Sequence, residues 1–403
     1  MSDMELQYLK IGDLCNVSSS KRVFARQYVD EGIPFYRQKE IIDKKNGNPL
    51  EEPIYISESV YNEFKDKSGV PESGDLLITA VGATLGIPYV VGNEKFYFKD
   101  GNLIWLSDFE EELNSTFLYY WIDSTFGTQI LWNRTIGSAQ PALTIDSIKK
   151  LSIPIPSRKI QDKIASTLKT YDEMLENNNK RIHLLERMAE NLYKEWFVRF
   201  RFSGYEGAEF EEKKPRGWQV GTEDKKQFAP TIFRYDEFGT IGSFVRGKNI
   251  TAAQMIEGNT PVISAGLQPS GYHNEANVFG ENLTISASGA NAGYLQYNLN
   301  DIWAADCSYY QDNATIWFVY NTLKYLQPVI SNLQCGAAQP HVYPKNINRL
   351  CILIPTRELI HKYNDFVKPY YDEIKVLNQH NQLLTQQRDM LLPRLMSGKL
   401  EVK

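Results

Sequence analysis

The stretch GSAQPALTIDSIKKLSIPIPSRK, residues 137–159, returns as GAAQPHVYPKNINRLCILIPTRE at residues 336–358. Aligned without a gap over 28 positions from the first glycine of each, the two copies share eleven identical residues. A match of this length within one chain indicates an internal repeat, because independent segments seldom keep so many residues in register. The repeat therefore predicts a chain built from two related halves.

A long helix is expected after each copy of the repeat. Residues 157–203 and 356–403 contain almost no glycine or proline and are rich in Leu, Lys, Glu, Gln and Asn. Apolar residues recur there at alternating intervals of four and three, which is the pattern of a coiled-coil seam about 50 Å long. The seam residues that stand out are Leu168, Leu175, Asn178 and Leu185 in the first helix and Ile374, Leu377, Asn381 and Leu384 in the second.

Each seam carries one asparagine near its centre, Asn178 in the first and Asn381 in the second. A lone buried asparagine in a coiled coil typically fixes the register or the orientation of the partner helix. If the two helices lie antiparallel with their centres aligned, we expect these two amides to face one another. The alternative is that each asparagine is an incidental polar break.

Two further pairs of segments occur in the same order in both halves. LLITAVGATLG at 76–86 and LTISASGANAG at 283–293 predict a strand that runs into a tight glycine turn. STFLYYWIDS at 115–124 and NTLKYLQPVI at 321–330 predict short apolar helices. Between the halves, residues 204–230 are polar and punctuated by glycine and proline, as expected of a connection.

Composition restricts the class of protein. With 42% hydrophobic and 23% charged residues in 403 positions, the chain is typical of a folded globular protein of two to four domains. We expect no membrane segment, because no window approaches eighteen uncharged apolar residues and the first residues lack a signal-peptide pattern. Its four cysteines lie far apart without the spacing of metal ligands, so neither zinc nor a disulfide framework is expected and a reducing cytoplasm fits best.

The sequence motifs for catalysis are weak. GSFVRGKN at 242–249 has the spacing of a phosphate-binding loop, but Asn249 stands where a serine or threonine would meet magnesium. An adenine methyltransferase would need a cofactor-binding glycine turn and an NPPY or DPPY segment, and neither is present. The five histidines are scattered along the chain. The sequence therefore predicts neither a catalytic site nor a metal site.

Taken as an ordered set, the motifs resemble a known family. GSAQPALTIDSIKKLSIPIP leading into a helix that ends NLYKEWFVRFRF, the later PRGWQV and the final LLPRLMSGKL are similar to the specificity subunits of type I restriction-modification systems. The resemblance covers essentially the whole chain and implies an α+β fold. Two mixed α/β target-recognition domains would be separated by two long antiparallel coiled-coil helices, with a pseudo-two-fold internal repeat. The implied boundaries are 1–156 and 204–355 for the recognition domains, the latter including the connection 204–230, and 157–203 and 356–403 for the helices.

The resemblance also implies a non-catalytic role in recognising double-stranded DNA. Two different reading units on one repeated frame predict a bipartite, asymmetric target. The implied partners are two modification subunits, which are adenine methyltransferases, and restriction subunits, which are ATP-dependent translocases and endonucleases. S-adenosylmethionine, ATP and magnesium would belong to those partners, and no cofactor is expected in this chain. The alternatives are a related system with a different methylase partner, a methyltransferase or nucleotide-dependent enzyme with an unrecognised site, and a coiled-coil scaffold whose globular units bind protein or sugar.

Basic and amide side chains suited to DNA contacts occur in both halves. The net charge of −5 runs against a nucleic-acid partner, but only one face of each unit needs to touch DNA. The candidates are Ser18, Ser20, Lys21, Arg22, Arg26, Arg37, Lys39, Arg134, Ser138 and Gln140 in the first half, and Arg246, Lys248, Asn249, Gln334, Gln339 and His341 in the second. For each of them a solvated surface position is the alternative. Because Gln140 and Gln339 are common to both copies, we expect them to brace the loop or contact the DNA backbone.

Overall fold

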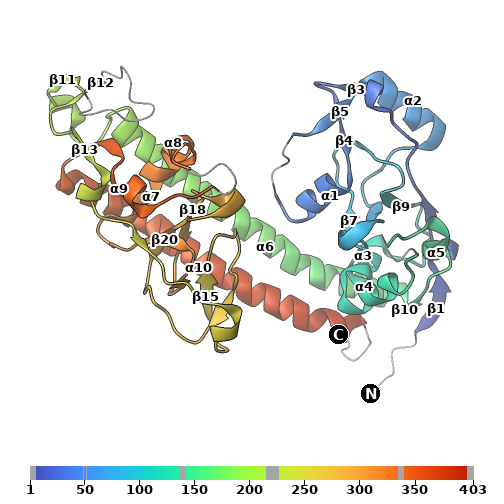
Figure 1. The fold of residues 1–403 in the computed structure, drawn as a ribbon. Coiled ribbons are helices and arrows are strands. Elements are labelled where there is room, and N and C mark those ends of the chain that lie inside the picture. Colours follow the sequence, from blue (N-terminus) through green and yellow to red (C-terminus); the bar gives the residue numbers. More distant parts are fainter. Residues whose placement is uncertain are drawn as a thin grey trace. The chain divides into compact units, whose positions relative to one another are not determined.

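The computed structural model describes residues 6–48, 50, 52–136, 141–214, 227–334 and 340–396. The chain forms two compact units, drawn in Figure 1. The first unit holds Met1–Asn177 together with Asn381–Lys403, and the second holds Asn178–His380. Each long helix therefore contributes one part to each unit. The boundaries predicted from the sequence treat the helices as separate segments, and they stay a prediction.

The strands of the first unit form two sheets and one separate antiparallel pair. The central sheet has the order β2-β9-β6-β7, with strands Asn16–Ser18 (β2), Leu76–Thr79 (β6), Pro88–Val90 (β7) and Leu103–Ser107 (β9). The second sheet has the order β3-β5-β4-β8, with strands Tyr28–Val29 (β3), Ile33–Tyr36 (β4), Ile54–Ile56 (β5) and Tyr97–Phe98 (β8). β1 (Gln7–Lys10) pairs antiparallel with β10 (Ser152–Ile155), which lies in the repeated segment. β6 and β9 are almost entirely apolar because they are buried at every position.

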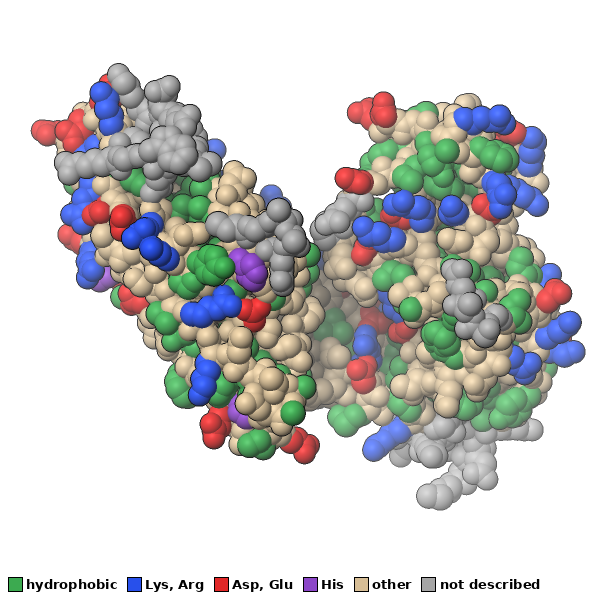
Figure 2. Space-filling model, viewed as in Figure 1, with side chains coloured by type: hydrophobic (Ala, Val, Ile, Leu, Met, Phe, Trp, Pro, Cys, Tyr) green, Lys and Arg blue, Asp and Glu red, His purple; other side chains and the backbone are tan. Residues whose placement is uncertain are grey.

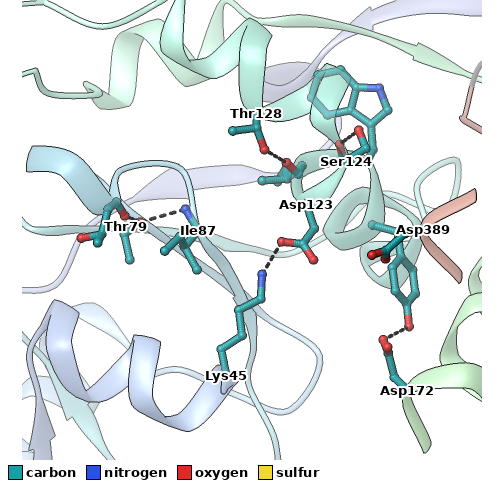
Figure 3. Close-up of polar contacts among 12 residues, drawn as sticks. Lys45, Thr79, Ile87, Asp123, Ser124, Thr128, Asp172 and Asp389 are labelled. Atoms are coloured by element: carbon teal, nitrogen blue, oxygen red, sulfur yellow. Dashed lines mark hydrogen bonds and ion pairs between the residues drawn. The ribbon is translucent and has the colours of Figure 1, made fainter. Parts of the chain in front are cut away.

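The helices in the first half of the chain include the short apolar helix and the long helix that the sequence predicts. Their bounds are Gln38–Lys45 (α1), Glu58–Ser68 (α2), Ser115–Asp123 (α3), Thr125–Trp132 (α4), Ile145–Lys149 (α5) and Arg158–Tyr193 (α6). The α3 helix packs on the central sheet through Phe117 and Trp121, which belong to the same buried cluster as Leu76. Figure 3 shows that Lys45 of α1 forms an ion pair with Asp123 at the end of α3, so α1 is tied to the helix that covers the sheet. The α5 helix starts in the repeated segment because Thr144 caps it, accepting a hydrogen bond from the amide of Ser147 at 3.1 Å.

The second unit repeats this arrangement. Its central sheet has the order β14-β20-β17-β18, with strands Val245–Arg246 (β14), Asn282–Ser286 (β17), Leu295–Asn298 (β18) and Cys307–Tyr310 (β20). Its second sheet has the order β16-β15-β19, with strands Thr260–Ile263 (β15), Gly271–His273 (β16) and Trp303–Ala304 (β19). β13 (Arg234–Glu237) pairs with β21 (Cys351–Ile354) as β1 pairs with β10. The helices in the second half of the chain are Ile316–Tyr325 (α7), Gln327–Ser331 (α8), Pro344–Asn348 (α9) and Arg357–Met396 (α10).

The internal repeat is therefore present in the strand order as well as in the sequence. β4 and β15 each pair parallel with one short strand, β8 and β19, in the second sheet of their unit. The units differ between β4 and β6, where the first carries α1 and α2 and the described part of the second has no helix between β15 and β17. The segment predicted as a connection holds β11 (Phe210–Lys213), which pairs with β12 (Gln227–Pro230). The mixed helix and sheet content and the repeated halves confirm the fold class expected from the sequence.

The long helices run antiparallel, as the second unit shows by itself. Arg181 of α6 forms an ion pair with Glu373 of α10 at 2.5 Å, and the Tyr363 hydroxyl donates to the carbonyl of Ala189 at 2.9 Å. Moving forward along α6 thus means moving backward along α10. The eight seam residues that stand out in the sequence are all buried or half-buried. Which of them face one another is a prediction, as is the pairing of Asn178 with Asn381.

Within the first unit, one partly buried polar contact joins both helices to the globular part. Arg388 of α10 donates to Asp172 of α6 at 2.8 Å, and the hydroxyl of Tyr120 in α3 donates to the other carboxylate oxygen of Asp172 at 2.5 Å. In Figure 3 a dashed line at Asp172 marks the hydrogen bond from Tyr120. Burial and the neighbouring Asp172 carboxylate both raise the pKa of Tyr120, so the hydroxyl remains a donor. Among the described helices, none is long and apolar enough to cross a membrane.

Candidate nucleic-acid interface

The glycine turn and the loop of the repeat meet in both units. The amide of Gly82 donates to the carbonyl of Pro141 at 3.0 Å, and that of Gly289 donates to Pro340 at 3.1 Å. Both glycines have left-handed backbones, with φ of 76° and 75°, which side chains disfavour. The described ends of the two repeated loops are thus held at equivalent places, against the glycine turns that follow β6 and β17.

The segment Ser18–Arg22 crosses from the central sheet to the second sheet of the first unit. The hydroxyl of Ser20 donates to the carbonyl of Phe98 at 2.7 Å, and the amide of Lys21 donates to the hydroxyl of Tyr97 at 2.8 Å. Ser20 is buried by this contact, which gives it a structural place, whereas the Lys21 and Arg22 side chains are exposed. Arg22 forms an ion pair with Asp100 at 3.0 Å.

The strand registers place the two candidate basic segments at the same point of the repeat. Ser18 pairs with Trp105, and Val245 pairs with Tyr309, at matching positions of β9 and β20. Lys21 and Lys248 each lie three residues further on, and the Lys248 amide donates to the carbonyl of Ala304 in β19 at 2.9 Å. The sequence did not align these two lysines, because the segments around them differ.

The start of α1 adds a second set of polar side chains to the first unit. Arg37 forms an ion pair with Glu40; although burial alone would raise the pKa of Glu40, the hydrogen bonds from Arg37 hold it below its usual value. Gln38, which sequence reasoning missed, donates from Nε2 to the carbonyl of Val81 and to the hydroxyl of Thr84, both at 2.8 Å. The start of α1 therefore packs against the glycine turn, and the next residue, Lys39, is exposed. Figure 2 shows basic side chains gathered over α1 and α2.

In the second unit the carboxylate of Asp306 lies between β14 and the glycine turn. Asp306 accepts from the guanidinium of Arg246 with one oxygen and from the hydroxyl of Ser288 with the other. Ser288 belongs to the glycine turn and forms a backbone bridge with His341, whose ring lies parallel to Tyr343 at 6.0 Å between centroids. Asp306 therefore joins β14 to the glycine turn, and the glycine turn in turn pairs with the end of the repeated loop. Neither Asp306 nor Ser288 was a sequence candidate, although Ser288 lies inside the repeated glycine segment.

The remaining candidates have varied places. Arg26 and Arg134 are exposed, the first over the ring of Phe24, and Asn249 is exposed beside Lys248. Gln334 donates from Nε2 to the carbonyl of Ala292 at 2.9 Å, so it braces the glycine turn of its unit. Ser138, Gln140 and Gln339 lie outside the described residues. The structure links Arg246 through Asp306 to the glycine turn that pairs with His341, and it gives Ser20 and Gln334 internal hydrogen-bond partners.

The described residues do not assemble a metal centre, since no group of three or more His, Cys, Asp or Glu side chains is placed to hold an ion. A polar cavity of about 410 Å³ lies beside the first basic segment and is lined in part by Lys21, Lys65 and Asp75. Burial raises the pKa of Asp75, which accepts a hydrogen bond from the indole of Trp105 at 2.8 Å. The arrangement of basic, amide and hydroxyl groups around a rigid turn is suited to contacts with phosphates and base edges.

Comparisons with known proteins agree with this geometry. Residues 3–187 and 231–386 match the sequence model of the type I restriction modification DNA specificity domain. The chain is 28% identical over 306 residues to the type I restriction enzyme MjaIX specificity subunit of Methanocaldococcus jannaschii, covering 72% of this chain and 70% of that one. It is 24% identical over 330 residues to the type I restriction enzyme HindI specificity subunit of Haemophilus influenzae, covering 64% and 71%.

A solved structure has the same fold. The type I restriction-modification S subunit from M. genitalium superimposes with a TM-score of 0.61, at 19% identity, over 98% of this chain and 97% of that one. The matched domain model occurs in both halves of the chain, in agreement with the internal repeat. Since that domain model covers most of the sequence, the chain belongs to the family of type I restriction modification DNA specificity domains and is the DNA-recognition subunit of such a system.

Proposed function

We propose that this specificity subunit reads a bipartite, asymmetric DNA target, with one half-site bound by each unit. The proposal rests on one observation. The two units have the same backbone arrangement, but the side chains around it differ. Lys21 and Lys248 occupy equivalent positions, as do the two glycine turns, whereas the side chains next to them differ. Common groups suit the DNA backbone, which is the same in both half-sites, and differing groups suit base edges.

The candidate contacts divide accordingly. Lys21, Lys248, Arg22, Arg26, Lys39 and Arg134 are exposed cations suited to phosphates. Gln140 and Gln339, in the repeated loop, would contact the backbone or brace the loop in the same way in both units. We also propose the domain boundaries that the sequence predicts, which are 1–156, 157–203, 204–355 and 356–403.

The long helices are proposed to dock two modification subunits and, through the assembly, restriction subunits. Each unit's part of the helices carries exposed apolar side chains that its own globular part leaves uncovered. They are Met174, Leu383 and Met390 in the first unit and Leu184, Met188, Phe366 and Val376 in the second. Exposed apolar surface on a helix is typical of an interaction site. The complex would work in the cytoplasm, where its DNA target lies.

The test is to co-express the chain with its modification subunit and to map methylated adenines across the host genome by single-molecule sequencing. The expected result is a split motif with two unlike halves, methylated on both strands. Absence of any motif from a complex shown to be assembled, with an active methyltransferase, would refute the proposed function.

A further inference from the structure

A cluster formed by Asp306, Arg246 and Ser288 distinguishes the second unit from the first. The carboxylate holds Arg246 from β14 and Ser288 from the glycine turn, and the two side chains of the ion pair remain 41% and 31% exposed. The contact with Asp306 uses one terminal nitrogen of the guanidinium, Nη2. A guanidinium carries five N–H donors in a planar fork, so this contact leaves a pair of parallel donors for another acceptor.

The first unit has neutral residues at each corresponding position. The carbonyl of Asp306 accepts from the amide of Ala287 as that of Asn102 accepts from Ala80, so Asp306 corresponds to Asn102. By the same register Arg246 corresponds to Ser19, whose hydroxyl donates to the carbonyl of Leu103 at 2.8 Å. The bridge between Ser288 and His341 is replaced by one between Val81 and Ala142. The charged cluster thus differs where the backbone frame is the same, as a determinant of one half-site requires.

We propose that Arg246, positioned by Asp306, reads a guanine in the half-site bound by the second unit. Arginine donates to the O6 and N7 atoms of guanine in the major groove through two parallel hydrogen bonds, and no other base pair offers that pair of acceptors. Asp306 orients the fork before DNA binds, so the arginine is already in the required rotamer. Asp306 is a positioning residue and does not itself touch the base. This inference rests on the proposed function of the second unit.

The experiment uses the complete complex with its modification subunit and duplexes carrying each of the four base pairs at every position of the wild-type motif. Initial methylation rates are compared for the wild type, Arg246→Ala, Arg246→Lys and Asp306→Asn. We expect Arg246→Ala to reduce discrimination at one G·C pair of one half-site by roughly 5- to 150-fold, the range for a two-bond arginine contact. Arg246→Lys keeps the charge but lacks the fork, so it should relax the same position. Asp306→Asn should relax it by a smaller factor.

Arg234→Ala is the matched control, because Arg234 is also an exposed arginine of this unit and forms an ion pair with Asp236 at 3.2 Å. It should leave base discrimination unchanged. The inference is overturned if the second half-site contains no G·C pair, or if Arg246 variants slow all duplexes equally, as a phosphate contact would. Should Arg246→Ala prevent assembly, the conservative Arg246→Lys and Asp306→Asn variants decide. A wild-type complex without any split motif would refute the proposed function itself, which separates the two failures.

Discussion

At the scale of single residues, the internal repeat acts as its own comparison. Lys21 and Lys248 lie in segments that differ in sequence, yet the same strand register positions them. We propose that these two side chains of the same charge, at equivalent points of a repeated frame, contact a ligand that is itself repeated, the phosphate backbone of a duplex.

We predict that Lys21→Ala and Lys248→Ala each weaken DNA binding by the assembled complex equally for all sequences. Each should reduce the slope of log K against log salt concentration by about 1, the effect of one phosphate contact. Fluorescence anisotropy over a salt series measures this. Lys169→Ala, which removes an exposed, ion-paired lysine from α6, should keep the wild-type slope. A change of base preference in either lysine variant would contradict the assignment to phosphates.

Gly127 shows how one residue shapes the turn between α3 and α4. A Cβ atom at this position would lie 2.0 Å from the carbonyl oxygen of Trp121, and that atom is backbone and cannot swing away. We predict that Gly127→Ala lowers the free energy of unfolding by about 1–3 kcal/mol, as overpacking does elsewhere. Urea denaturation checks this, with Gly92→Ala as the control because its Cβ would meet nothing within 4 Å. Equal stability of the two variants would contradict the close approach.

At the scale of elements, the same helix position is used in two chemically different ways. In the first unit Tyr120 of α3 donates to Asp172 of α6, and in the second Asn321 of α7 donates to the hydroxyl of Tyr371 of α10 at 3.1 Å. Asp172 and Tyr371 correspond when the repeat is aligned. The ring of Tyr371 also stacks on Trp317 at 3.5 Å. A hydrogen bond to a carboxylate therefore joins the short and long helices in one unit, and aromatic stacking joins them in the other.

We predict that Arg388→Ala lowers the free energy of unfolding by about 1–2 kcal/mol, a value between those for exposed and buried ion pairs. The reason is that Asp172, about a third exposed, would lose its guanidinium partner. Arg181→Ala breaks an ion pair between the same helices that is 52% and 42% exposed, and it should change stability by less than about 0.5 kcal/mol. Both are measured by chemical denaturation, and a larger effect at Arg181 would reverse the interpretation.

At the scale of the whole molecule, two reading units carried by an antiparallel helix pair predict that the length of the helices sets the spacer between the two half-sites. The units share their frame, so the specificity of each half-site belongs to its own unit and the spacer belongs to the helices. This division is a prediction about function, and it follows from the repeat and from the proposed DNA target.

We predict that inserting one heptad into α6 and one into α10, at facing levels, changes the spacer and leaves both half-sites intact. Seven helical residues add about 10 Å, or roughly 3 base pairs. A full heptad keeps the seam in register, so folding should be preserved. Methylation mapping of the variant measures the spacer. An unchanged spacer in an active complex would contradict the prediction that helix length sets it.

The sequence predicted some parts of the candidate site and missed others. The glycine turns, the repeated loop and the basic segments stood out because glycine, proline and charge carry local information. Gln38 and Asp306 did not stand out, since an isolated glutamine or aspartate in a loop has no local signal. Ser20 and Gln334 were candidates for DNA contacts, but their side chains have internal partners that the sequence does not reveal.

By itself the sequence determined the repeat, the order of the glycine-turn strand, the repeated loop and the long helix in each half, and the family. These depend on periodicity, turn residues and identity between copies, which are properties of neighbouring positions. Only the tertiary structure decided that Lys21 matches Lys248 and that Arg246, Ser288 and Asp306 form one cluster. Arg246 and Asp306 are separated by 60 positions, and the sheet that brings them together is formed by long-range pairing. The partners of a side chain depend on that pairing, and no local pattern records it.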